Sequence, residues 1–153
     1  MFTITYGALI SLLEAITGVE LYLTGGRVFG AAAPAYPGDL LATSVDGIDD
    51  IDLIAPSGKG VAYKIMAALG ATLVLGGSAT GSTRLRMFEA LTLDIIVLDP
   101  IQVQAWQYAT EECKKLRYKA GTTMQTMIRK ETRVAVFAAL CRSYLNGVEL
   151  NFN

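Results

Sequence analysis

The pattern of apolar and polar residues predicts a chain that passes repeatedly between helix and strand. Apolar residues recur at helical spacing in four segments, whereas short, dense apolar runs bounded by Gly, Pro or Ser indicate strands. The predicted helices span residues 6–16, 59–69, 101–119 and 123–145. The predicted strands span residues 19–23, 48–54, 71–75, 84–88 and 91–98. This order predicts an α+β fold, in which a small mixed sheet is backed by helices and two further helices follow at the C-terminal end.

The length of 153 residues fits one domain with a substantial core. We expect residues 1–100 to form an α+β core and residues 101–153 to form a helical segment packed on that core. Gly, Ala, Pro and Asp fill the segment 30–47, which predicts a long loop after a brief helical turn. Long loops in compact domains are often functional or disordered.

Composition argues for a soluble cytoplasmic protein without a membrane partner. Hydrophobic residues make up 52% of the chain, yet no apolar run reaches the roughly 18 uncharged residues of a membrane span. The N-terminal segment lacks basic residues and Glu14 interrupts it, which predicts a first helix rather than a signal peptide.

The absence of histidine narrows the possible chemistry. Without histidine, the chain can form neither a Ser-His nor a Cys-His catalytic pair, and it can offer no histidine ligand to zinc. The two cysteines, Cys113 and Cys141, match no metal or redox spacing and are expected to be core thiols. Any catalysis would therefore use carboxylates, Lys, Tyr or hydroxyl groups.

Charge is divided unevenly between the two parts of the chain. Residues 1–100 contain ten acids and five bases, and residues 101–153 contain four acids and eight bases. An acidic part beside a basic part suits a substrate that carries both a metal ion and phosphates. A solvated basic helix face explains the second part equally well.

Two glycine loops imitate nucleotide-binding motifs. In GGRVFG (25–30) the glycines are adjacent and then four apart, which does not fit a dinucleotide-binding fingerprint. In GGSATGST (76–83) Ser82 replaces the lysine of a phosphate loop and a strand follows, so a hairpin connection is favoured. The bare N–H groups of Gly25 and Gly26 could still approach a phosphate, with a tight strand-to-helix turn as the alternative.

Acidic residues on two predicted strands form a candidate metal site. In DDIDLIAP (49–56), Asp50 and Asp52 share one strand face while Asp49 points the other way. Asp94 is the one acid within LTLDIIVL (91–98), and it completes a triad if the two strands are neighbours. Three carboxylates a few Å apart repel by about 1 kcal/mol per pair in water-like surroundings. The nearest basic residues in the sequence are Lys59 and Lys64, and nothing in the pattern indicates that they pair with these acids. A site made only of oxygen ligands, without Cys or His, favours Mg²⁺ or Mn²⁺.

The order of these motifs resembles the DNA polymerase β-type nucleotidyltransferase superfamily. The elements are LTGG (23–26), DIDL (50–53) and LDIIV (93–97), and the resemblance covers about residues 5–99. GGRV followed by DIDL is most similar to the tRNA CCA-adding and poly(A) polymerase branch. The small size of the chain resembles that of minimal stand-alone members of the superfamily, which could include phage-type members. The 23 residues between Gly26 and Asp50 form a longer gap than compact members have, and the segment 27–29 lacks the acid that often follows the glycines in the CCA-adding branch.

The resemblance implies Mg²⁺- or Mn²⁺-dependent transfer of a nucleoside monophosphate from an NTP such as ATP to a hydroxyl acceptor. It implies that Asp50 and Asp52 hold a metal on the triphosphate, and that Asp94 joins them at a second metal that activates the attacking hydroxyl. The N–H groups of Gly25 and Gly26, helped by Arg27, would take the β- and γ-phosphates. The acceptor stays open between tRNA or another nucleic acid, a protein and a small molecule.

Two other functions stay open. The first is a catalytically silent binding or assembly protein of phage or mobile-element type, which docks to itself or to another protein through the C-terminal helices. The second is a toxin or antitoxin partner that nucleotidylates tRNA or protein. Arg84 and Arg86 on one strand, and a basic cluster at 129–133, could meet phosphate, although surface solvation is favoured for both sets. Trp106 is expected in the core rather than stacked on a base.

Overall fold

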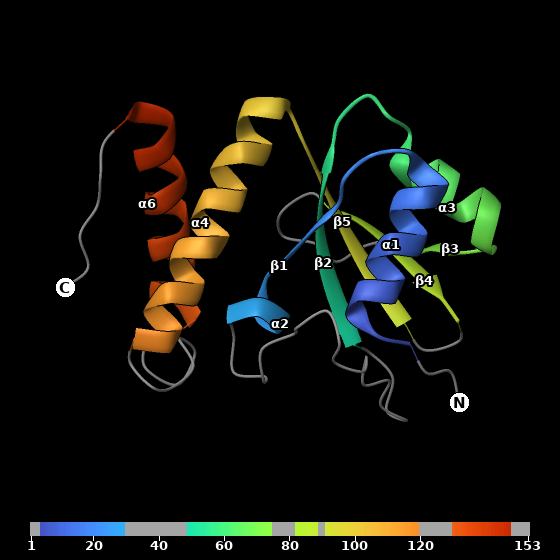
Figure 1. Ribbon diagram of the computed structural model, residues 1–153, viewed down its shortest axis with the longest axis horizontal. Coiled ribbons are helices and arrows are strands. Elements are labelled where there is room, and N and C mark those ends of the chain that lie inside the picture. Colours follow the sequence, from blue (N-terminus) through green and yellow to red (C-terminus); the bar gives the residue numbers. More distant parts are fainter. Residues whose placement is uncertain (1–3, 30–48, 75–81, 89–90, 120–129, 148–153) are drawn as a thin grey trace. The chain divides into compact units, whose positions relative to one another are not determined.

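The computed structural model describes residues 4–29, 49–74, 82–88, 91–119 and 130–147 of the chain (Figure 1). The chain divides into two compact units. The first unit comprises Met1–Leu23 and Ala35–Leu98, and the second comprises Thr24–Pro34 and Asp99–Asn153. The second unit thus combines the segment that follows Leu23 with the C-terminal part of the chain.

A five-stranded mixed sheet forms the centre of the first unit. The strands lie in the order β1-β2-β5-β4-β3. Their bounds are β1 Tyr22–Thr24, β2 Asp49–Pro56, β3 Thr72–Val74, β4 Thr83–Met87 and β5 Leu91–Leu98. The two longest strands, β2 and β5, run parallel, whereas β4 is antiparallel to both β5 and β3. The expected α+β class with a mixed sheet is therefore confirmed.

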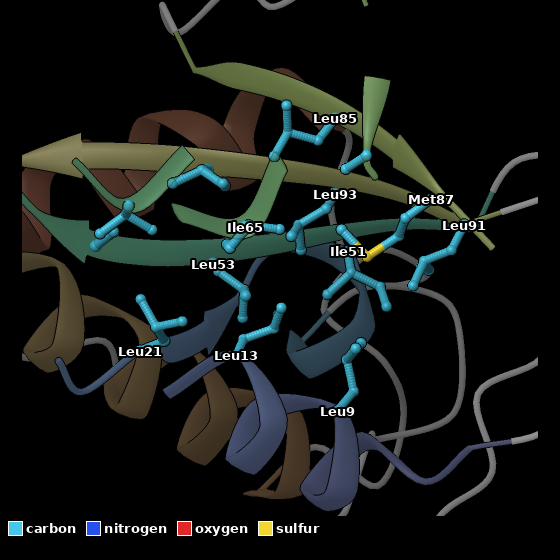
Figure 2. Packing of buried hydrophobic residues seen from close by; sticks show 14 of the residues in the cluster. Leu9, Leu13, Leu21, Ile51, Leu53, Ile65, Leu85, Met87, Leu91 and Leu93 are labelled. Atoms are coloured by element: carbon cyan, nitrogen blue, oxygen red, sulfur yellow. The ribbon is translucent and has the colours of Figure 1, made fainter. Parts of the chain in front are cut away.

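Two helices, α1 (Tyr6–Thr17) and α3 (Val61–Leu69), contribute to the hydrophobic core with one face of this sheet. Figure 2 shows Leu9 and Leu13 of α1 and Ile65 of α3 gathered with side chains from the strands. The strand residues alternate, as a pleated sheet with one buried face requires. On β2 the core residues are Ile51, Leu53 and Ala55, and on β5 they are Leu91, Leu93 and Ile95.

One apolar row crosses four strands of the sheet. Ile51 on β2 is the register partner of Leu93 on β5, which in turn pairs with Leu85 on β4. These three side chains are fully buried. Leu73 continues the row onto the edge strand β3, where it is 45% exposed. Burial therefore falls along a single row from the sheet centre to its edge.

Local signals at the helix ends match the sequence pattern. The Thr5 hydroxyl accepts a hydrogen bond from Ala8 N at 3.1 Å and caps α1. Gly70 ends α3 in the left-handed region at φ 64°, where a side chain would be strained, and its N–H donates to Met66 O. The predicted stop of this helix at Gly70 is confirmed.

The second unit contains helices α2 (Gly26–Phe29), α4 (Pro100–Lys119) and α6 (Lys130–Asn146). Helices α4 and α6 pack against each other, and Ala105, Ala109, Cys113 and Leu140 on these helices are buried. The ring of Trp106 meets that of Phe137 edge-on, with centroids 5.0 Å apart. Trp106 is therefore half-buried against α6, rather than fully buried in a core as expected.

Differences from the predicted elements are small. Strand β1 begins at Tyr22 rather than at residue 19, and β2 extends to Pro56. The loop expected at 30–47 and the beginning of the helix expected at 123–145 lie outside the described residues. Most of GGSATGST does too, but β3 and β4 on either side of it pair antiparallel, as a hairpin connection requires. Within the described residues, no helix has the length and apolarity needed to cross a bilayer.

The apolar row allows a matched test of the core. We expect Leu93→Ala to lower the free energy of unfolding by about 2–5 kcal/mol, because it leaves a cavity at the sheet centre. Leu73→Ala removes the same atoms from the same row, but its side chain is 45% exposed, so we expect a loss below about 1 kcal/mol. Urea unfolding followed by circular dichroism measures both. Equal losses would contradict this row as the centre of the core.

Candidate functional site

The sheet face opposite the apolar core carries a row of charged residues. Asp52 on β2 is the register partner of Asp94 on β5, and Asp94 is the partner of Arg84 on β4. Since neighbouring strands lie about 5 Å apart, the two acids stand next to each other on one face. We call Asp52, Asp94 and Arg84 the charged row. The condition for the predicted triad, that the two acidic strands be neighbours, is met.

Arg84 donates two hydrogen bonds to the carboxylate of Asp94. Its Nε donates to Oδ1 at 2.7 Å and its Nη2 donates to Oδ2 at 3.1 Å. The side chain of Asp94 is 8% exposed and that of Arg84 is 25% exposed. A planar fork of this kind is the strongest common form of ion pair between side chains. Asp94 therefore carries a buried negative charge that has a cationic partner.

This ion pair differs from the sequence expectation, which assigned Arg84 to solvent and considered only Lys59 and Lys64 as partners for the acids. The missed signal was the hairpin between β4 and β5. Met87 pairs with Leu91, so the connection has only three residues, and counting outward from it places Arg84 opposite Asp94. Phe88 begins the connection at a positive φ of 51°, as short hairpins often require.

Thr92 adds a second polar feature to this face. Its side chain lies two positions from Asp94 on β5, between the register positions of Asp50 on β2 and Arg86 on β4. The residue is only 1% exposed, and its hydroxyl finds no hydrogen-bond partner in the described part of the chain. A buried hydroxyl without a partner costs about 1–3 kcal/mol. Among the described residues, this face therefore holds a hydrogen-bonding group without a partner beside the charged row.

Asp50, the third expected carboxylate, lies in β2 two positions from Asp52. Its backbone is in register with Thr92, and its side chain lies outside the described part of the structure. Among the described side chains, no group of three or more acids, cysteines or histidines comes together. The carboxylates of Asp52 and Asp94 and the hydroxyl of Thr92 all offer the hard oxygen atoms that Mg²⁺ and Mn²⁺ prefer.

The fork of Arg84 leaves room for a metal at Asp94. A carboxylate has about four lone-pair sites, and the two hydrogen bonds from Arg84 use two of them. The remaining sites could accept a cation, although the positive charge of Arg84 opposes this. The residues of this face thus fit a divalent ion that must compete with an arginine.

The glycine turn belongs to the second unit, whereas the carboxylates belong to the first. Gly25 adopts φ 77°, Gly26 opens α2, and Val28 N donates to Gly25 O at 2.9 Å. This is the tight strand-to-helix turn expected as the alternative to phosphate binding, and it accounts for glycine at position 25. The side chain of Arg27 lies outside the described part.

A chain of hydroxyl groups ties this turn to α4. Thr24 and Thr110 bring their hydroxyl oxygens within 2.8 Å of each other, and the Thr110 hydroxyl donates to Trp106 O at 2.7 Å. Because Thr110 uses its proton on Trp106, Thr24 is the donor in the first bond. The backbone before Gly25 is therefore fixed to α4 within the second unit.

Neither cysteine is suited to nucleophilic chemistry. Cys113 is fully buried in α4, and the Sγ of Cys141 donates to Ala105 O at 3.8 Å. Burial raises the pKa of the Cys141 thiol to about 11. Since the thiolate is the reactive form, this group is inert at neutral pH.

No protein-family model, curated protein or solved structure matches this chain.

The unpartnered hydroxyl leads to a stability prediction. We expect Thr92→Val to raise the free energy of unfolding by about 1 kcal/mol, because the substitution keeps the shape and removes a buried polar group without a partner. Thr17→Val is the matched control in the same unit. The Thr17 hydroxyl donates to Leu13 O at 2.7 Å, so its loss should lower stability by about 0.5–1.5 kcal/mol. Opposite signs in urea unfolding support an unused hydroxyl at Thr92, whereas equal losses contradict it.

The raised pKa of Cys141 leads to a prediction about alkylation. At pH 8 the folded protein should react with iodoacetamide more than about tenfold more slowly than the urea-unfolded protein, because far less thiolate is present. The rate should climb as the pH approaches about 11, the pKa of the Cys141 thiol. Mass spectrometry of Cys141 peptides at timed intervals measures the rate. A rate at pH 8 equal to that of the unfolded chain would contradict the raised pKa.

Proposed function

We propose that the protein is a Mg²⁺- or Mn²⁺-dependent nucleotidyltransferase that moves a nucleoside monophosphate from an NTP to a hydroxyl acceptor. The observation that carries this proposal is the register of Asp52 and Asp94 on neighbouring parallel strands. Two carboxylates side by side on one sheet face offer the hard oxygen ligands that a divalent cation prefers, and such a cation would compete with Arg84 for Asp94. The unused hydroxyl of Thr92 on the same face adds a further oxygen donor.

Asp50, Asp52 and Asp94 are the proposed ligands for two metal ions. When bound, such ions neutralise phosphate charge and lower the pKa of an attacking hydroxyl. The chain supplies the rigid support, because all three residues stand on the two central strands of the sheet. Held in this way, the carboxylates lose little freedom when they bind a ligand, which favours binding.

Gly25, Gly26 and Arg27 stay the predicted contacts of the β- and γ-phosphates. The acceptor stays open between a nucleic acid such as tRNA, a protein and a small molecule. The excess of basic residues in 101–153 favours an acceptor that carries phosphates. From the sequence, we also expect the protein to be cytoplasmic and of phage-type origin.

Substitution of the acids tests the proposed function directly. We expect Asp52→Asn, like Asp50→Asn, to lower Mg²⁺-dependent nucleotide transfer by at least about a hundredfold, because a neutral amide holds a metal poorly. The protein is incubated with Mg²⁺ and each α-³²P-labelled NTP, with RNA, DNA and protein offered as acceptors. Circular dichroism checks that each variant stays folded.

Asp99→Asn is the control for this experiment. It removes one negative charge from an exposed position outside the proposed site, so activity should be unchanged. The proposal fails if the unmodified protein neither binds Mg²⁺·NTP nor transfers a labelled nucleotide to any acceptor class.

The Arg84–Asp94 ion pair favours a second candidate function, a catalytically silent binding or assembly protein. The guanidinium neutralises Asp94 without a metal, so the acid can serve the stability of the sheet alone. Such a protein would act through its helices on a second copy or another protein. The same labelling experiment separates the two functions, since this candidate predicts neither nucleotide transfer nor binding of Mg²⁺·NTP.

A further inference from the structure

The charged row places a cation where the proposed metal would bind. Arg84 holds both oxygens of Asp94, and Asp94 in turn stands beside Asp52. A guanidinium and a divalent ion are alternative ways to neutralise the carboxylate of Asp94. A metal at the remaining lone-pair sites of Asp94 would be repelled by the guanidinium, because both carry positive charge. The occupancy of Asp94 is therefore a competition.

We propose that Arg84 is an internal competitor for divalent metal, which occupies Asp94 in the metal-free protein and is displaced from it when Mg²⁺ or Mn²⁺ binds. This inference rests on the proposed function, because it needs the carboxylates to bind metal. It adds a regulatory element to that site. The chain sets its own threshold for metal, and binding frees a guanidinium on the same face.

The geometry supports an exchange at this position. Asp94 is buried on a central strand and cannot turn away to solvent, whereas Arg84 is 25% exposed and lies on β4. Arginine has a long, flexible side chain whose charged end can move without moving the backbone. The partner that leaves is therefore Arg84, and the partner that stays is Asp94.

Thr92 is an independent sign that a ligand belongs on this face. The residue is 1% exposed, and its buried hydroxyl has no partner in the described part of the chain. An ion pair between Arg84 and Asp94 does not explain this group, because the pair leaves the hydroxyl unused. A hydrated cation at Asp94 would supply what the hydroxyl lacks, since metal-bound water donates and accepts hydrogen bonds.

Arg86 provides a matched control on the same strand. Arg84 and Arg86 share one face of β4, and their register partners on β5 are Asp94 and Thr92 respectively. Removing either arginine changes the charge of the face by the same amount. Only Arg84 forms the fork to Asp94, so only its removal should end the competition.

The test is titration of the metal-free full-length protein with Mn²⁺ alone, followed by electron paramagnetic resonance of free Mn²⁺. We expect Arg84→Gln to bind Mn²⁺ about ten- to a hundredfold more tightly than the unmodified protein, the range that a charged hydrogen bond corresponds to. Arg86→Gln should stay within about threefold of the unmodified protein, as distant charge effects are screened by salt.

Three outcomes are distinguishable. Tighter binding by Arg84→Gln alone supports the inference. Binding that is equal in all three proteins, or that both variants strengthen equally, overturns the inference while the proposed metal site stands. The absence of Mn²⁺ binding in every protein overturns the proposed function, and the inference falls with it.

A second measurement avoids reliance on a variant that fails to fold. In the unmodified protein, the NMR signal of the Arg84 Nε–H group should move on addition of Mg²⁺, because its hydrogen bond to Asp94 Oδ1 is lost. Arg84→Lys, which keeps the charge, identifies the signal by its disappearance. A signal that stays in place while Mg²⁺ binds would overturn the displacement of Arg84.

Discussion

The parallel pairing of β2 with β5 is the constraint on which the rest of the first unit depends. One register places Ile51 beside Leu93 on the core face and Asp52 beside Asp94 on the other. A slip of a single residue would turn the acids into the core and the aliphatic side chains out of it. The cost of burying charge in that slipped state is large. The apolar core therefore fixes the position of the polar face, and the candidate site is a consequence of packing on the opposite side.

Charge compensation links this constraint to function. Asp94 is buried on a central strand, and a buried carboxylate that keeps its charge needs a cationic partner. Arg84 meets that need in the structure through its fork. A metal would meet the same need and would also engage Asp52. Stability and the proposed activity thus draw on the same atoms, which is why the ion pair bears on both candidate functions.

Within the described part of the chain, the second unit is held together by helix packing and by local hydrogen bonds rather than by a sheet. Its helices α4 and α6 pack against each other, with two aromatic contacts between them, Trp106 with Phe137 and Tyr108 with Tyr144. The Gly25 turn is explained by its backbone angle and by hydroxyl bonds from Thr24 to α4. These local causes are sufficient for glycine at this position. Only the resemblance of the motif to nucleotidyltransferases supports a phosphate-binding role for this turn. The proposed metal-binding role of Asp52 and Asp94 is also supported by their register on neighbouring strands.

Periodicity in the sequence was enough to predict helix α3 with its stop at Gly70 and strand β5 at its observed bounds. These features depend on neighbours a few residues away. The start of β1 was placed too early, because Leu21 N donates to the Glu14 side chain at 3.1 Å instead of to a strand. The Arg84–Asp94 pair was within reach of the sequence, through the three-residue hairpin connection, but was missed. Only the tertiary structure could bring β2 beside β5 in parallel, because that pairing joins distant segments and depends on the core that they bury together.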